Sequence, residues 1–287
     1  SPELAEQLMR DARIAALAYG HDLTLVLLPG NAGFGAANNA AVAHAESGRV
    51  LIVNPDVFPF DQDWAARHSN LLAELPAAQT RLFGAPLYYD DGSLMHGGMY
   101  FDGDPVVSME ANGFSRHTTL RVEHYGKGAP AYTEEFLRSR PVPAVTGAFI
   151  SIERSWFERL GGFSDEYVLG HYEDADLCLK SLQNGTPAWV HDVKLWHLEG
   201  KGSARRQAPH EGGSIVNRWL FNRRWAATIV PDLLGSRPSH PLIRSGLRAP
   251  ETMPRAPALV QANPGHPAAK KPLLAQRPET RAAAKPQ

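Results

Sequence analysis

The chain has 287 residues, 43% of them hydrophobic and 21% charged, so it is long enough to bury a substantial apolar core. Its apolar stretches are far shorter than the roughly 20 residues of a membrane-spanning helix, and its single cysteine, Cys178, excludes an internal disulfide framework and a cysteine-based metal site. The net charge of -1 does not indicate nucleic-acid binding, and we expect no nucleic-acid partner.

The first fifty residues alternate between helical and extended patterns. Residues 2–18 follow a serine and repeat leucine and isoleucine at helical spacing, which predicts a helix. Residues 22–30, with the sequence DLTLVLLPG, predict a strand that is buried on both faces of a parallel sheet. A glycine turn that opens a helix follows in residues 31–45, and residues 49–53 predict another strand. This order favours an α/β domain with a mainly parallel sheet.

The middle of the chain has a less regular pattern. We expect a helix in residues 62–74, a strand near 81–85 and a hairpin near 94–101. Residues 102–140 predict a long flexible loop that acts as a lid or binds an acceptor, because long connections in compact domains are often functional. The elements expected after this loop are a strand and a short helix that stops at Gly161 and Gly162, a helix at 173–183 with Gly185 as its cap, one or two strands in 188–200 and a basic amphipathic helix at 213–230.

Residues 236–287 differ in composition from the rest of the chain. They hold 9 Lys or Arg against 2 Asp or Glu, a charge of 9 - 2 = +7, together with 10 of the 23 prolines. Such a segment lacks the apolar surface that would offset the entropy of ordering, so we predict a disordered tail behind a folded domain at 1–235. The positive charge is typical of a solubilising terminus, or of a segment that contacts an anionic membrane surface.

A glycine motif stands at the start of the second predicted helix. Gly33, Gly35 and Asn38 form the pattern G-x-G-x-x-N, one residue away from the dinucleotide-binding fingerprint, and Asp56 follows about 20 residues later as that fingerprint requires. Asn38 would obstruct the close packing that the third glycine allows, and Asp56 lies beyond the end of its strand. A dinucleotide-binding oxidoreductase is therefore the weaker alternative, beside a purely structural helix start.

Three acidic residues and a histidine are candidates for chemistry. Asp56 follows a buried strand on a turn stiffened by Pro55, where its carboxylate could bind Mg²⁺ or Mn²⁺, although a lone aspartate is usually a turn residue. Glu173 and Asp174 could supply a general base, or could simply stabilise a helix N-terminus through the helix dipole. His197, at the end of a predicted strand, is more often a structural histidine than a ligand.

The order of these motifs carries a resemblance. The segments NAGFGAANNAAVAHAESGRVLIVNPDVFP, VTGAFISIERSWFERLGGFSDEYVLGHYEDADLCLKSLQNG and VKLWHLEG resemble the inverting GT-A glycosyltransferases of family 2, particularly the rhamnosyltransferase-like members, over residues 4–231. The resemblance implies a GT-A fold, which is Rossmann-like with a mainly parallel sheet flanked by helices. It also implies two nucleotide-binding strands ahead of residue 1, so we expect an N-terminally truncated domain, either as a fragment or as a degenerate domain.

The resemblance also implies roles for individual residues. Asp174 would be the general base, with Glu173 orienting the acceptor or sharing the role. The Asn54-Pro55-Asp56 turn matches the Asp-x-Asp motif of the family, with asparagine in place of the first aspartate. The remaining implied sets are Asn31, Gly33, Asn39, Asn54 and Asp56 for the donor, Gly147, Ala148 and Tyr172 for the acceptor, and Asp56 and His197 for a Mg²⁺ or Mn²⁺ ion.

The implied activity is transfer of a hexosyl group, with rhamnosyl favoured, from a nucleotide-diphosphate sugar to a glycan or lipid-linked glycan with inversion. We therefore expect a cytoplasmic enzyme of bacterial surface polysaccharide synthesis, and contact of its basic tail with the inner face of the membrane stays open beside a solubilising role. A second function class stays open, which is a non-catalytic glycan-binding or scaffolding domain that retains the fold.

Overall fold

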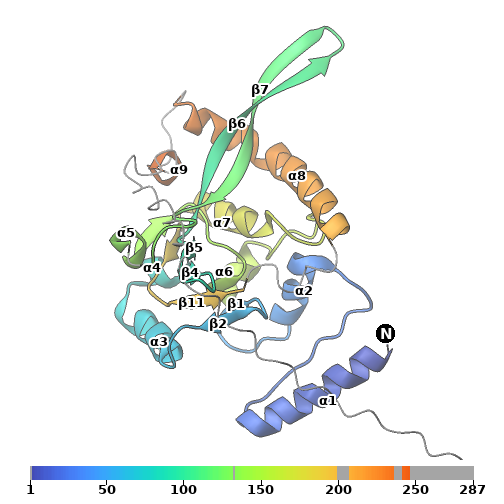
Figure 1. Ribbon diagram of the computed structural model, residues 1–287, viewed down its shortest axis with the longest axis vertical. Helices are drawn as coiled ribbons and strands as arrows, with labels where there is room; N and C mark the ends of the chain where they lie inside the picture. The colour runs from blue at the N-terminus through green and yellow to red at the C-terminus, as the bar shows by residue number, and fades with distance from the viewer. Residues whose placement is uncertain (1, 132, 199–206, 236–240, 246–287) are drawn as a thin grey trace, which may run out of the picture. The chain divides into compact units, whose positions relative to one another are not determined.

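The computed structural model of the protein describes residues 2–131, 133–198, 207–235 and 241–245 (Figure 1). The chain divides into two units, residues 1–253 and 254–287, and the second unit lies wholly outside the described residues. None of the helices described combines the length and the apolar composition that crossing a bilayer requires.

The elements that the structure describes mix helices and strands along the whole first unit. The helices are α1 (Pro2–Tyr19), α2 (Gly33–Val42), α3 (Trp64–Glu74), α4 (Ala77–Thr80), α5 (Glu134–Leu137), α6 (Arg154–Arg159), α7 (Glu173–Gln183), α8 (Gln207–Leu233) and α9 (Pro241–Ser245). The strands are β1 (Arg49–Val53), β2 (Val57–Pro59), β3 (Leu82–Gly84), β4 (Leu87–Tyr88), β5 (Leu94–His96), β6 (Met99–Glu110), β7 (Gly113–His124), β8 (Arg140–Val142), β9 (Phe149–Glu153), β10 (Ala188–Val190) and β11 (Leu195–His197).

The main sheet has the strand order β1-β9-β3-β10-β8. Strand β9 lies between β1 and β3 and pairs antiparallel with both, while β3 and β10 are parallel and β10 and β8 are antiparallel. The prediction of mainly parallel pairing is therefore wrong for the described strands. An apolar run shows that a strand is buried on both faces, but it does not show the direction of the neighbouring strands.

The core is built around the centre of this sheet. Phe149, Ile150 and Ile152 of β9 are almost completely buried, as the apolar sequence FISIE predicts. Helix α7 packs through a stripe of buried residues at helical spacing, namely Ala175, Cys178, Leu179 and Leu182. The single cysteine therefore serves as a core residue. This packing fixes the first turn of α7, where Glu173 and Asp174 lie.

A second sheet brings two distant turns together. Its strand order is β2-β11-β4-β5, and Val57 of β2 pairs with His197 of β11. The stacked rings of Phe60 and Trp196, with centroids 4.6 Å apart, reinforce this pairing. The turn before β2, which contains Asp56, is thereby held beside the end of β11.

The prediction of a flexible loop at 102–140 is wrong for the first half of this segment, because β6 and β7 form a long hairpin. The two strands pair from Met99 with His124 to Glu110 with Gly113. Helix α8 lies beside this hairpin in Figure 1, and Asn222 of α8 bonds both the backbone N–H and the C=O of Leu120. The hairpin predicted near 94–101 is likewise replaced by β5 and the start of β6.

The prediction of a strand at residues 22–30 is also wrong, because residues 21–28 have no regular secondary structure. Leu23, Leu25 and Leu27 of this segment are exposed, at 56%, 41% and 47%. A strand needs a neighbour to satisfy its backbone groups, and the described residues offer this segment none. Strand β1 pairs with β9 along one edge, and Leu51 and Val53 of β1 are exposed.

Most other predicted elements are confirmed within a few residues, including α1, α2, β1, α3, β3, β9, α6, α7 and α8. Gly161, Gly162 and Gly185 adopt positive φ values of 77°, 64° and 79° at the two predicted helix ends. The prediction of disorder is wrong for residues 241–245, which form α9 with Ile243 buried. The rest of the predicted tail lies outside the described residues.

Candidate active site

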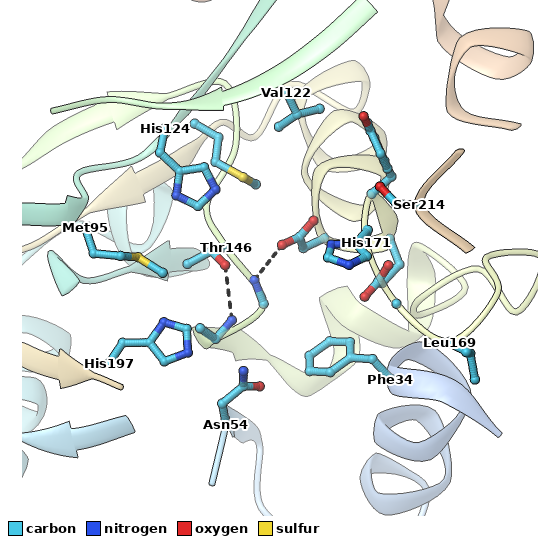
Figure 2. Close-up of a pocket in the computed structure, with 17 residues that line it drawn as sticks. Phe34, Asn54, Met95, Val122, His124, Thr146, Leu169, His171, His197 and Ser214 are labelled. Carbon is cyan, nitrogen blue, oxygen red and sulfur yellow. Dashed lines mark hydrogen bonds between the residues drawn. The ribbon is translucent and has the colours of Figure 1, made fainter. Parts of the chain in front are cut away.

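A cavity of about 420 Å³ opens where the two sheets, the hairpin and the N-terminus of α7 meet (Figure 2). The predicted residues Asn54, Gly147, Ala148, Tyr172, Glu173, Asp174 and His197 all line it. Segments that are more than a hundred residues apart in the sequence therefore converge on one space. This convergence is what a binding or catalytic site requires.

Asp174 is fixed in the cavity by backbone hydrogen bonds. Its Oδ2 accepts a hydrogen bond of 2.8 Å from the N–H of Gly147 (Figure 2). Its Oδ1 accepts one of 2.8 Å from the N–H of Ala175. A side chain at position 147 would not fit, because a Cβ there would lie 2.9 Å from the ring of Phe34. Gly147 therefore allows the close approach through which its N–H holds this carboxylate at the cavity.

Glu173, the neighbour of Asp174 in the chain, is buried. Burial, followed by the charge of Asp174, raises the pKa of Glu173 to about 8. Its Oε2 has no hydrogen-bond partner among the described residues. Burial therefore favours the protonated form of Glu173 at neutral pH.

The raised pKa of Glu173 predicts a stability change with pH. In the unfolded chain this carboxyl ionises near pH 4.3, whereas in the folded chain it stays protonated until about pH 8. Its contribution to stability is therefore present below pH 4.3 and is lost as pH rises through 8. Glu173→Gln should match the natural protein in thermal denaturation at pH 4 and exceed its melting temperature at pH 9. Equal melting temperatures of the two proteins at pH 9 would contradict the raised pKa of Glu173.

The loop before α7 has a strained backbone. Leu169, His171 and Tyr172 have φ values of 61°, 83° and 75°, which non-glycine residues rarely adopt. On one side the N–H of Phe34 donates to the C=O of Leu169 at 2.7 Å. On the other side lies the wholly buried Asn217 of α8. This strained loop carries Tyr172 and leads directly into Glu173 and Asp174, so whatever holds it also positions the site.

Asn217 holds the strained loop through its amide group. Its Oδ1 accepts from the N–H of Val168 at 2.7 Å, and its Nδ2 donates to the C=O groups of Val168, Gly170 and His171 at 2.9, 2.6 and 3.2 Å. The helix α8 is tied to α7 as well, because Trp225 donates its ring N–H to the buried Asp176 at 2.8 Å. These side chains of α8 set where α7 begins.

Removing this amide should weaken the protein and loosen the loop. Asn217→Ala leaves several buried backbone groups without partners, and we expect it to lower the free energy of unfolding by about 3 kcal/mol. Hydrogen exchange should also accelerate at the amides of residues 168–172. The control is Asn184→Ala, which removes an exposed amide and should change stability by less than about 0.5 kcal/mol. Unchanged exchange at 168–172 in Asn217→Ala would show that the loop is held by other contacts.

Asp56 and His197 form a second polar pair beside the cavity. The Oδ1 of Asp56 lies 3.3 Å from Nε2 of the buried His197, whose Nδ1 has no hydrogen-bond partner in the described part of the chain. Two ligands of one octahedral ion at 2.1 Å lie about 3 Å apart, so this spacing fits a shared Mg²⁺ or Mn²⁺. The described residues contain no cluster of three or more acidic, histidine or cysteine ligands. Such an ion would need further ligands from water or a substrate.

The structure places the residues predicted to bind a donor in two groups. Asn54 lines the cavity, and its N–H donates to the C=O of Ala148 at 3.0 Å. Asn31 accepts from the N–H of Gly33 at 3.1 Å, outside the cavity lining. Asn39 bonds both the N–H and the C=O of Phe163, at 3.0 and 2.8 Å. Both the nitrogen and the oxygen of the Asn39 amide bond backbone groups there, which favours a structural role over contact with a ligand.

The interpretation of Gly33, Gly35 and Asn38 as a dinucleotide-binding motif is wrong, because the structure does not meet a requirement of that motif. The fingerprint needs a strand directly before the glycine turn, and residues 21–32 contain no strand. Gly33 instead allows a close approach to the strained loop, since a Cβ there would lie 2.9 Å from Cα of Leu169.

The arrangement of the sheets is shared with a solved structure of GalNAc-T7 in complex with UDP, GalNAc and Mn²⁺. The match has a TM-score of 0.50 and 14% sequence identity, and it covers 86% of this chain and 45% of that chain. The chain has the GT-A glycosyltransferase fold. The GT-A fold thus confirms the predicted fold class, with the sheet corrected as described above.

Sequence comparison agrees with the GT-A fold, although no protein-family model matches the chain. The chain is 29% identical over 194 residues to the uncharacterized protein y4gI of Sinorhizobium fredii and 27% identical over 200 residues to the O-antigen biosynthesis protein RfbC of Myxococcus xanthus. These matches cover 67% and 69% of this chain. The chain spans only 20% and 14% of the length of those two relatives.

A third relative matches this GT-A chain over most of its own length. It is the N-acetylglucosaminyl-diphospho-decaprenol L-rhamnosyltransferase of Mycobacterium tuberculosis, which is 27% identical over 249 residues. The match covers 77% of this chain and 76% of that protein. The chain is therefore similar to rhamnosyltransferases and to proteins of O-antigen synthesis.

Several residues that line the cavity of this GT-A chain were not among the predicted site residues. They are Phe34, Met95, Met99, Val122, His124, Thr146, Leu169, Gly170, His171 and Ser214. The hairpin contributes three of them, Met99, Val122 and His124. A signal for the hairpin is present, because Asn112 and Gly113 form the dipeptide that most strongly marks a hairpin turn.

Proposed function

We propose that this chain transfers a glycosyl group from a nucleotide-diphosphate sugar to a hydroxyl group of a glycan or lipid-linked glycan, with inversion at the anomeric carbon. The observation that carries the proposal is the pairing of two sites at one cavity. Asp174 supplies an oriented carboxylate, and the Asp56–His197 pair lies at the side of the same cavity, which His197 lines. A base and an anion-stabilising site are the two things that this displacement needs.

Asp174 acts as the general base in this proposal. Its carboxylate accepts the proton of the acceptor hydroxyl while the hydroxyl oxygen attacks the anomeric carbon. The bond from that carbon to the diphosphate breaks in the same step, so the sugar is transferred with inverted configuration. The N–H of Gly147 keeps the carboxylate in position, and the raised pKa of Glu173 makes that neighbour a poorer candidate for the base.

Asp56 and His197 would hold a Mg²⁺ or Mn²⁺ ion. When bound, such an ion neutralises the charge that develops on the departing nucleoside diphosphate. In the Asp-x-Asp motif that this turn resembles, Asn54 takes the place of the first aspartate, so this chain offers one carboxylate and one imidazole rather than two carboxylates. Phosphate oxygens and water are the natural source of the remaining ligands.

The relatives support the choice of substrates. The similarity to an L-rhamnosyltransferase that is named for N-acetylglucosaminyl-diphospho-decaprenol favours rhamnosyl as the transferred group and a lipid-linked sugar as the acceptor. The similarity to an O-antigen biosynthesis protein favours a role in surface polysaccharide synthesis. A cytoplasmic location at the inner face of the membrane fits such an acceptor, and it remains a prediction.

A non-catalytic glycan-binding domain is the second candidate. It is favoured by the unpaired edge of β1 and by residues 21–28, which lie outside any sheet in the described part of the chain. A domain of this kind would keep the cavity and bind a saccharide without binding a nucleotide.

The test is binding and turnover with a panel of nucleotide sugars. The panel contains dTDP-rhamnose, UDP-galactose and GDP-mannose, each with and without Mn²⁺. A thermal shift that needs Mn²⁺ and occurs with one donor, together with release of its nucleoside diphosphate in the presence of an acceptor, supports transfer. Saccharide binding with no shift from any nucleotide sugar would support the glycan-binding candidate instead.

A further inference from the structure

The far end of the hairpin formed by β6 and β7 exposes large apolar side chains. Val107, Met109 and Phe114 are 60%, 82% and 79% exposed. Figure 1 shows this end of the hairpin projecting past α8, away from the other labelled elements. Single exposed apolar side chains are common on proteins, but a group of them in one place marks an interaction surface.

These three side chains share one face of the hairpin with a cation. Val107 pairs with Arg116, and Met109 pairs with Phe114. Residues that pair directly across two strands, and alternate residues along one strand, point to the same face. Arg116 is exposed as well. We call Val107, Met109, Phe114 and Arg116 the tip face. At the same level the opposite face of the hairpin carries a pair of serine residues, so this end of the hairpin is amphipathic.

The tip face continues a surface that is covered nearer the body of the protein. Phe101 lies on the same face by alternation and is wholly buried, with its ring stacked on Phe221 of α8 at a centroid distance of 5.9 Å. Met99 and Val122, also on this face, line the cavity. One face of the hairpin therefore runs from the cavity, past α8, to the tip face. Among the described residues, no element covers its outer end.

The size and charge of the tip face suit a lipid surface. A stable protein interface takes roughly 20 residues from each partner, whereas the tip face consists of four. A bilayer needs only a few apolar side chains at the boundary between headgroups and acyl chains, and a cation beside them is attracted to anionic headgroups. Arg116 supplies that cation, and residues 236–287 add 9 Lys or Arg against 2 Asp or Glu. This balance of charge favours anionic lipid.

We propose that the tip face docks on an anionic lipid surface. Val107, Met109 and Phe114 enter the boundary between headgroups and acyl chains, and Arg116 binds phosphate oxygens of the headgroups. Because the base of the same two strands lines the cavity, docking holds the cavity at the surface in which a lipid-linked acceptor is anchored. The inference goes beyond the proposed function, since docking itself requires no transfer.

The experiment measures sedimentation of the full chain with vesicles of phosphatidylcholine alone, or of phosphatidylcholine and phosphatidylglycerol in equal parts. We expect binding to the anionic vesicles, about tenfold weaker in Phe114→Ser and about fivefold weaker in Arg116→Ala. Leu17→Ser is the matched control, because Leu17 is 85% exposed on α1 and lies outside the tip face. The control should bind as the natural protein does.

The basic segment at 236–287 is the same in every variant. Binding through that segment alone would therefore give Phe114→Ser the affinity of the natural protein, and this result would overturn the proposal. The absence of binding to either kind of vesicle would overturn it as well.

A fluorescent label reports whether the tip itself enters lipid. The single cysteine, Cys178, is buried, so Met109→Cys supplies one reactive thiol for a nitrobenzoxadiazole dye. Its emission should rise on anionic vesicles, whereas the same dye on Ser69→Cys, at an exposed position of α3, should not respond. A rise in emission with protein concentration in the absence of vesicles would assign the tip face to a second copy of the chain and overturn the proposal.

These measurements contain no sugar and no turnover, so they are independent of the proposed function. A chain that binds vesicles through the tip face and transfers nothing would defeat the proposed function alone. A chain that transfers a glycosyl group and does not bind vesicles would defeat this inference alone.

Discussion

Replacing Asp174 with asparagine should lower the turnover number of the proposed transfer by about 10²- to 10⁴-fold, the usual contribution of a positioned general base. The amide has nearly the same shape and its oxygen can still accept from the N–H of Gly147, whereas the hydrogen bond from the N–H of Ala175 is lost because the amide nitrogen cannot accept it. It has no basic oxygen to take the proton of the acceptor hydroxyl. Binding of the nucleotide sugar should stay within about threefold of the natural value, because the loss occurs in the transition state.

The matched control for Asp174→Asn is Asp165→Asn, the same change at an exposed aspartate outside the cavity lining. Steady-state kinetics with varied donor and varied acceptor separate the turnover number from the two Michaelis constants. Natural turnover in Asp174→Asn would remove the assignment of the base. A fall in turnover of equal size in the control would indicate a general effect of lost charge.

Replacing Asp56 with alanine should weaken Mn²⁺ binding by at least about 100-fold, since loss of even an outer hydrogen bond to a metal ligand costs 10- to 100-fold. The carboxylate lies 3.3 Å from Nε2 of His197, and its removal would leave His197 as the only protein ligand of the proposed pair. Titration of Mn²⁺ followed by electron paramagnetic resonance, in the presence of a nucleoside diphosphate, reports binding without any turnover. His197→Gln should weaken binding in the same titration.

The control for the metal titration is Asp61→Ala, which removes an exposed carboxylate that pairs with Arg67 a few residues along the chain. It should bind Mn²⁺ as the natural protein does. If Asp56→Ala also retained the natural affinity, the ion would be held elsewhere and the Asp56–His197 pair would be a hydrogen bond between two structural residues.

The elements that could be predicted from the sequence are those whose pattern is local. Helix α7 was predictable because its apolar residues follow helical spacing and Gly185 ends it. The segment at 21–28 has an equally clear apolar pattern, yet it forms no strand, because a strand depends on a neighbour that no local pattern encodes. The hairpin was missed because Gly103 and Pro105 in β6 suggest a loop, and tertiary contacts with α8 override them.

The site was predictable where motifs have a fixed order along the chain. Asn54, Glu173, Asp174 and His197 converge on the cavity as that order predicts. The sequence alone could not reveal Asn217, since it bonds backbone groups 46 to 49 residues away in the loop before another helix. Asn39 illustrates the converse, because a residue in a well-placed motif is engaged with the backbone of Phe163.

The left-handed residues before α7 have a consequence for engineering. Each non-glycine residue in this conformation costs roughly 1 kcal/mol or more, so a screen for heat resistance should favour substitutions, such as His171→Gly, that relieve it. The same substitutions would make the first turn of α7 more mobile. The carboxylate of Asp174 would then no longer be held in one position. Variants chosen for thermal stability alone are therefore expected to lose turnover first at this loop, and heat resistance and catalysis would have to be selected together.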